Sequence, residues 1–130
     1  MKKIIAFILS IFAIFVVSSC DKKTGDKITY EQINGDQAKA LMDSETNYII
    51  IDARTQSEYD EGHIKGAILI PETEISKRAE KELPDKNQLI LVYCRSGRRS
   101  KIAAQALVDL GYTNVKEFGG IIDWKYEIVK

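Results

Sequence analysis

The thiol of Cys94 opens the run CRSGRRS at residues 94–100, whose residue types could support reactive chemistry. A cysteine attacks as its thiolate, and nearby cations or a helix N-terminus stabilise that form. Gly97 lets the backbone curl so that successive amides converge on an anion. We therefore expect nucleophilic thiol chemistry on an anionic substrate. The loop expected to bind it consists of Arg95, Ser96, Gly97, Arg98 and Arg99.

The three arginines of this run stand where a helix begins, and positive charge there opposes the helix dipole. Their clustering therefore indicates that an anion compensates them. Lowering the pKa of the thiol raises the thiolate fraction but also weakens the thiolate as a nucleophile. Because the net gain in attack rate is small, we expect the loop to serve mainly in binding an anionic donor and stabilising a charged product.

The elements on either side of Cys94 must position it. Residues 89–93 (LILVY) form a continuous apolar run that predicts a buried strand, and Arg98–Leu110 is the best helix candidate, closed by Gly111. The residues expected on the buried face of this helix are Ile102, Ala103, Ala106, Leu107 and Leu110. Cys94 then lies at the carboxyl end of a central strand, where open α/β sheets bind ligands.

Similar apolar runs predict further strands at 48–51, 67–70 and 115–118, with a short β-prone stretch at 28–30. Helices are expected after Asn34, over 74–83 and near Trp124, which we expect in the core. Strands that alternate with helices predict an α/β fold. We expect a small parallel sheet of about four to five strands with helices on both faces, occupying residues 28–130.

The N-terminus has the features of an export signal. Lys2 and Lys3 precede the apolar run 4–17, which is shorter than the roughly 20 residues that a membrane-spanning helix needs. Residues 17–20 (VSSC) resemble the lipobox of bacterial lipoproteins, in which the cysteine is lipidated. We expect a lipoprotein signal peptide over 1–19, with lipidated Cys20 and a flexible tether over 20–27. The alternative is an uncleaved N-terminal anchor.

This interpretation places the protein outside the cytoplasm. We expect it to be exported and to face the periplasm, anchored by lipid to the outer side of the inner membrane or in the outer membrane. A free thiol in an oxidising compartment is at risk, so a periplasmic thiol reductant is an expected partner. The 19 basic side chains balance 19 acidic ones without a basic stripe, which argues against nucleic acid.

Taken together, three motifs resemble the rhodanese family of sulfurtransferases. That family's active-site pattern Cys-Arg-x-Gly-x-Arg is matched by Cys94, Arg95, Gly97 and Arg99. Its upstream signature resembles Ile51-Asp52-Ala53-Arg54, Glu58-Tyr59, Gly62-His63-Ile64, Gly66-Ala67 and Pro71. Its downstream ending resembles Gly119, Gly120 and Trp124. The resemblance spans about residues 28–127.

The resemblance implies a mechanism. The thiolate of Cys94 takes the outer sulfur of a donor such as thiosulfate and passes it from a persulfide to a thiol or cyanide. The loop amides would cradle the persulfide, and Arg99 and Arg95 would attract the donor's charge. No metal or organic cofactor is needed.

Two further groups are expected to support the site rather than to react. Asp52 and Arg54 end a strand near the same edge, where an ion pair or a hydrogen bond to a loop is the favoured interpretation. His63 stands between glycines and is expected to hold a turn by hydrogen bonds of its imidazole.

Two rival functions stay open from the sequence. A phosphatase or arsenate reductase would need Cys-x5-Arg, but Ser100 stands where that arginine should be and Arg99 comes one residue early. The second rival function is that of a non-catalytic persulfide carrier or binding module with the same fold. A disulfide framework is excluded if Cys20 is lipidated, because Cys94 then has no partner.

Overall fold

The computed structural model describes residues 29–130, so the predicted signal peptide (1–19), Cys20 and the tether (20–27) lie outside it. The strands are β1 (Glu31–Gln32), β2 (Tyr48–Asp52), β3 (His63–Ile64), β4 (Ile68–Leu69), β5 (Leu89–Cys94), β6 (Val115–Gly120) and β7 (Ile128–Val129). The α-helices are α1 (Gly35–Ser44), α2 (Gln56–Glu61), α3 (Ile75–Glu82) and α4 (Arg98–Asp109). Two 3₁₀ turns cover Glu72–Glu74 and Ile121–Asp123.

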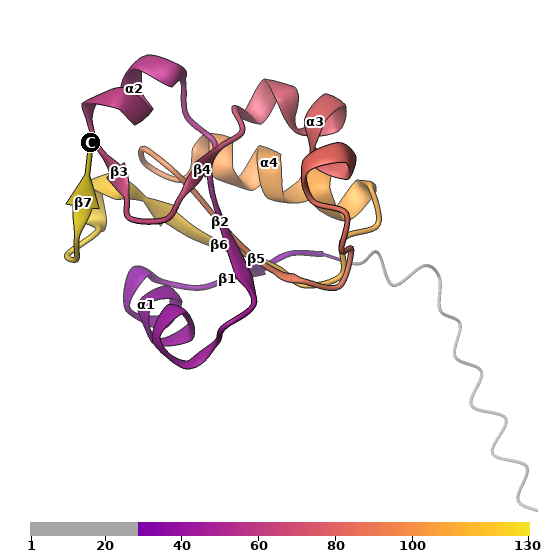
Figure 1. Ribbon diagram of the computed structural model, residues 1–130, viewed down its shortest axis with the longest axis horizontal. Coiled ribbons are helices and arrows are strands. Elements are labelled where there is room, and N and C mark those ends of the chain that lie inside the picture. Colours follow the sequence, from indigo (N-terminus) through magenta and orange to yellow (C-terminus); the bar gives the residue numbers. More distant parts are fainter. Residues whose placement is uncertain (1–28) are drawn as a thin grey trace, which may run out of the picture.

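The main sheet has five parallel strands in the order β1-β6-β5-β2-β4. In Figure 1 it lies between α1 on one side and α3 and α4 on the other. Strand β5 lies at its centre, paired with β2 and β6, and all six of its residues are buried. A strand buried on both faces must be apolar throughout, which explains the unbroken run LILVY. The predicted fold class, a small parallel sheet with flanking helices, is therefore confirmed.

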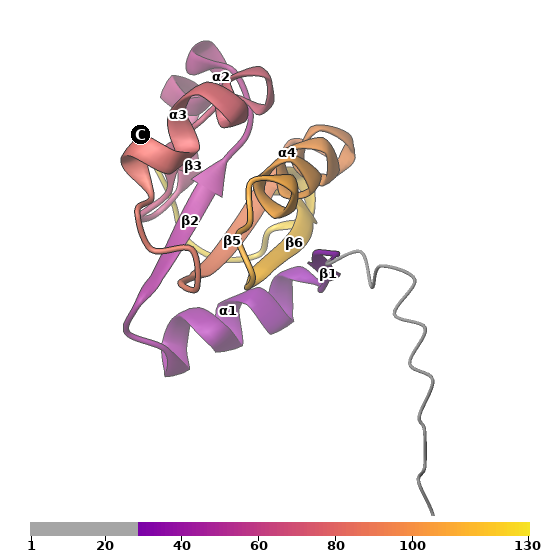
Figure 2. The same cartoon turned by 90° about the vertical axis from the view of Figure 1, so that its right-hand side faces the viewer.

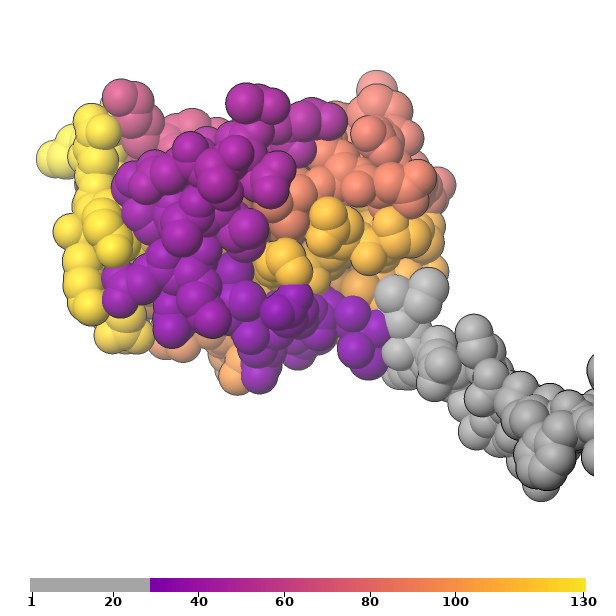
Figure 3. Space-filling model, turned by 90° about the horizontal axis from the view of Figure 1, so that it is seen from below, coloured from indigo at the N-terminus to yellow at the C-terminus, as the bar shows by residue number. Residues whose placement is uncertain are grey.

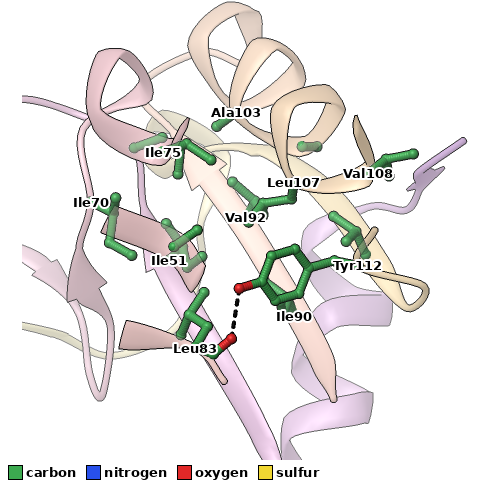
Figure 4. Close-up of a cluster of buried hydrophobic side chains, with 14 of the residues drawn as sticks. Ile51, Ile70, Ile75, Leu83, Ile90, Val92, Ala103, Leu107, Val108 and Tyr112 are labelled. Atoms are coloured by element: carbon green, nitrogen blue, oxygen red, sulfur yellow. Dashed lines mark hydrogen bonds between the residues drawn. The ribbon is translucent and has the colours of Figure 1, made fainter. Parts of the chain in front are cut away.

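Helices cover both faces of this sheet (Figure 2). One core cluster joins the sheet to α3 and α4; it includes Ile51, Val92, Ala103 and Leu107 (Figure 4). Within it, the hydroxyl of Tyr112 donates to the carbonyl of Leu83 at 2.6 Å. The other face packs on α1, which covers much of the view from below beside the C-terminal segment (Figure 3).

Local signals explain where the first two helices begin. Asn34 caps α1 by accepting from the amide of Gln37 at 2.8 Å, and the Gln37 side chain accepts from the Asn34 amide in return. Thr55 and Glu58 form the same reciprocal arrangement at the start of α2. Such capping boxes satisfy amides that have no partner within the helix.

The structure corrects several details of the sequence interpretation. Ile102 is 46% exposed, because the buried face of α4 runs through 103, 104, 107 and 108 and the helix turns Ile102 about 100° away. Helix α2 and the antiparallel pair β3–β7 were not predicted, since both are short. Strand β1 begins at Glu31, beyond the β-prone stretch at 28–30. Trp124 is only half-buried, against the cluster on the α1 face.

Among residues 29–130, no helix is long and apolar enough to cross a membrane.

Candidate active site

Cys94 is the last residue of β5, and its thiol lies beneath the loop that leads into α4. The residue is 1% exposed, and the amide of Gly97 donates to its Sγ at 3.0 Å. The pairing between β5 and β6 shifts register between Val92 and Cys94, so that Cys94 pairs with Gly120. Such irregularities re-aim side chains at the ends of strands. The thiol is thus held at the base of the loop.

Burial and hydrogen bonding act on this thiol in opposite directions. Burial raises the pKa of Cys94, because a thiolate is poorly solvated there. Hydrogen bonds from the Ser100 hydroxyl and from the amides of Ser100, Gly97 and Ser96 lower it, and the net result is a lowered pKa. The loop amides, of which that of Gly97 lies 3.0 Å from Sγ, therefore favour a negative charge on the sulfur.

Two glycines permit this loop geometry. Gly97 has φ +113°, a left-handed conformation that side chains rarely adopt, and it caps α4. Gly120 lies against the loop itself: a Cβ there would sit 1.9 Å from the carbonyl oxygen of Arg95. The amide of Ile122 donates to that same oxygen at 3.3 Å. The end of β6 and the residues that follow it therefore fix the position of the loop after Cys94 at the Arg95 carbonyl.

The three arginines differ in their surroundings. Arg99 makes a two-point ion pair with Glu58, at 2.6 and 2.9 Å, while Arg95 and Arg98 are exposed. Hydrogen bonds from Arg99 lower the pKa of Glu58 to about 2 despite partial burial, and Thr55 adds to the effect. The anion that the arginine cluster requires is thus supplied in part by the protein itself, at Glu58, rather than entirely by a ligand.

Asp52 and Arg54 form a buried ion pair next to the site. Arg54 Nη2 lies 2.7 Å from Asp52 Oδ2 and donates to the carbonyl of Gly62 at 2.6 Å. The hydroxyl of Tyr93 donates to Asp52 Oδ2 at 2.6 Å and accepts from the amide of Ile64 at 3.0 Å. Burial, then Asp52, raises the pKa of Tyr93. This network ties β2 and β5 to β3.

His63 is the first residue of β3 and follows the turn at Gly62, directly after α2. Its Nδ1 is 2.9 Å from the carbonyl oxygen of Tyr59, and its ring stacks on that of Tyr59 at 3.7 Å between centroids. Both contacts hold the turn, as expected from the glycines around it. Within residues 29–130, no three His, Cys, Asp or Glu side chains gather where they could hold a metal ion.

Ser100 and Glu117 belong to the same site, although sequence reasoning did not select them. Both are buried, and the Ser100 hydroxyl donates to Glu117 Oε1 at 2.7 Å. The amide of Gly119 donates to the same oxygen at 2.7 Å. The sequence did contain a signal for Glu117, because an acid stands inside the otherwise strand-like run VKEF. For Glu58 the signal was the helix-capping pattern Thr-x-x-Glu.

Comparisons with known proteins agree with this fold. The family model of the rhodanese-like domain matches residues 34–127. Thiosulfate sulfurtransferase PspE of Escherichia coli is 42% identical over 73 residues, which are 56% of this chain and 70% of that protein. Thiosulfate sulfurtransferase GlpE of Coxiella burnetii is 35% identical over 97 residues, 74% of this chain and 88% of that protein.

A solved structure described as a rhodanese with anions from Escherichia coli superposes with a TM-score of 0.61 at 40% identity. The match covers 64% of this chain and 98% of that one. The chain belongs to the rhodanese-like family, and it is a sulfurtransferase of the rhodanese type, as the sequence predicted.

Proposed function

We propose that this protein moves sulfane sulfur from a small anionic donor such as thiosulfate to a thiol or cyanide through a persulfide on Cys94. The observation that carries this proposal is the amide-lined position of Cys94 Sγ, with the Gly97 amide at 3.0 Å. Amides that stabilise one negative sulfur can stabilise the terminal sulfur of a persulfide as well.

The two half-reactions balance without a metal or a redox partner. The Cys94 thiolate attacks the outer sulfur of thiosulfate, an S–S bond forms to Cys94, and the old S–S bond breaks to release sulfite. An acceptor thiolate or cyanide then attacks the outer sulfur of the persulfide and returns Cys94 to its thiolate. Arg95 and Arg98 are exposed beside the loop, so they are free to attract the anionic donor.

The loop also favours sulfur over phosphate. Where a cysteine phosphatase places its arginine, this chain has Ser100, which is buried and faces Glu117. The neighbouring Arg99 does not replace that arginine, because it comes one residue early and its guanidinium is paired with Glu58 at 2.6 and 2.9 Å. The functional assay therefore compares the two chemistries in one preparation.

The test measures thiocyanate formation from thiosulfate and cyanide, and hydrolysis of an aryl phosphate, for the native protein and Cys94→Ser. We expect thiocyanate formation that Cys94→Ser abolishes, with negligible phosphate hydrolysis. Comparable turnover of the aryl phosphate would contradict the proposal. A persulfide that forms only when another protein supplies the sulfur would instead identify a carrier.

For location, we propose an exported lipoprotein anchored through Cys20 and facing the periplasm, with a periplasmic thiol reductant that keeps Cys94 reduced. The support is the order of two lysines, an apolar run and the sequence VSSC at the N-terminus. Labelling cells with a radioactive fatty acid tests the anchor. The native protein should take up label and appear in membrane fractions, whereas Cys20→Ser should take up none; equal labelling of both would contradict lipidation at Cys20.

A further inference from the structure

Glu117 is a buried acid to which the sulfur-transfer steps assign no role. Its residue is 2% exposed on β6, and its Oε1 accepts hydrogen bonds from the Ser100 hydroxyl and the Gly119 amide, both at 2.7 Å. Within the part of the chain that the structure describes, it forms no ion pair. Burying a carboxylate without a cation costs stability. Its place behind the Cys94 loop therefore indicates a role in the site.

Ser100 connects Glu117 to the sulfur. A hydroxyl has one hydrogen to donate, and several acceptors surround this one. Glu117 Oε1 lies at 2.7 Å, the Gly97 carbonyl at 3.0 Å and the Gly119 carbonyl at 3.3 Å. The hydroxyl also lies at the Gly97 peptide, whose amide donates to Cys94 Sγ, and it lowers the pKa of Cys94 only when its hydrogen turns from Glu117 to the sulfur. The carboxylate is the nearest acceptor with a charge, so it holds the hydrogen most strongly while the thiol is neutral.

The remaining charged groups around the sulfur are largely matched. They are two ion pairs, Arg99 with Glu58 and Asp52 with Arg54, and two exposed arginines, Arg95 and Arg98. The two other acids of this group, Glu58 and Asp52, thus each have an arginine of their own. Of the acids in this group, Glu117 is the one that has no ion-pair partner among residues 29–130.

We propose that Glu117 is a positioning residue for Cys94, which withholds the Ser100 hydrogen from the sulfur and so keeps the resting thiol protonated. The loop amides favour the thiolate form of Cys94, whereas Glu117 favours the protonated thiol. The inference deepens the proposed function, because a thiol that stays protonated between turnovers resists oxidation while it waits for a donor.

The test follows alkylation of Cys94 by iodoacetamide as a function of pH in the reduced full-length protein. Trypsin releases Cys94 in the peptide Asn87–Arg95, so its mass separates Cys94 from Cys20. Glu117→Gln keeps the accepting Oε1 but loses the charge. We expect the midpoint of the alkylation profile to fall by about one pH unit. Glu45→Gln, at an exposed position after α1, is the matched control and should leave the midpoint unchanged.

An unchanged or raised midpoint in Glu117→Gln would overturn the proposal. Ser100→Ala provides a second measurement that stands even if Glu117→Gln fails to fold. Because Glu117 already holds the hydrogen, removing the hydroxyl should move the midpoint less than Glu117→Gln does. A large upward shift in Ser100→Ala would mean that the hydroxyl serves the sulfur at rest, which contradicts the proposal.

The double variant tests the route. If Glu117 acts through the Ser100 hydroxyl, its effect should shrink when that hydroxyl is absent. In a Ser100→Ala background, Glu117→Gln should lower the midpoint of the alkylation profile by less than half of the shift that it causes in the native protein. An undiminished shift there would overturn the role of the hydroxyl. The assay contains no sulfur donor, so its outcome is separate from the question of whether thiosulfate is the substrate.

Discussion

Arg99 and Glu58 form a two-point ion pair that ties the first turn of α4 to α2, with Nη1–Oε1 at 2.6 Å and Nη2–Oε2 at 2.9 Å. The two residues are 41 positions apart in the sequence. The pair matches the planar guanidinium to the planar carboxylate, which is the strongest geometry for such contacts. It also neutralises one of the three arginines around Cys94, so the loop presents less positive charge than its sequence suggests.

Removing the charge of Glu58 should therefore strengthen binding of an anionic donor. Glu58→Gln leaves Arg99 without its counter-charge, and we expect KM for thiosulfate to fall a few-fold while kcat changes little. Steady-state kinetics over a range of thiosulfate concentrations measures both constants. An unchanged or raised KM would show that Arg99 does not reach the donor.

The same pair should make folding stability depend on pH in the acid range. The pKa of Glu58 is about 2 in the folded protein against an ordinary value of 4.5, so the unfolded chain binds its proton more readily. The contribution of the pair is therefore complete above about pH 4.5 and is lost as pH falls toward 2. Urea unfolding at pH 6 and pH 3 should show a larger loss of unfolding free energy for the native protein than for Glu58→Gln. Equal losses would contradict this linkage.

The Tyr93 hydroxyl should stabilise the fold substantially. Tyr93→Phe removes a donor to Asp52 and an acceptor for the Ile64 amide, both buried. We expect a loss of about 1–3 kcal/mol of unfolding free energy. Tyr126→Phe is the matched control, since its hydroxyl bonds Asp36 at an exposed site, and it should cost no more than about 0.5 kcal/mol. Similar losses for the two variants would show that the buried network adds nothing.

Gly120→Ala should damage the loop rather than the helices. A Cβ at Gly120 would meet the Arg95 carbonyl at 1.9 Å, so the loop must move away from Cys94. A displacement of that kind costs about a hundredfold in rate. The control Gly35→Ala meets Trp124 at 3.5 Å, an ordinary contact, and should keep its activity. Thiocyanate formation measures both variants, and near-native activity of Gly120→Ala would contradict the close packing of loop and strand.

Structural features that depend on residues close together in the chain could be predicted from the sequence. Strand β5, the loop and α4 follow one another directly, so the position of Cys94 at the end of a buried strand could be inferred from residues 89–110 alone. The anionic partner of Arg99 could not, because Glu58 comes from a distant helix of six residues. Glu117 reaches Ser100 only through the pairing of β6 with β5. Ile102 was misplaced because a shift of one residue in helical phase exchanges a buried face for an exposed one.

The central claim is that Cys94 carries sulfur as a persulfide, and intact mass spectrometry of the protein after treatment with thiosulfate tests it most directly. We predict a gain of one sulfur atom in the native protein, its removal by cyanide, and no gain in Cys94→Ala. A native protein that gains no sulfur while Cys94 is reduced, or a gain that persists in Cys94→Ala, would contradict the account.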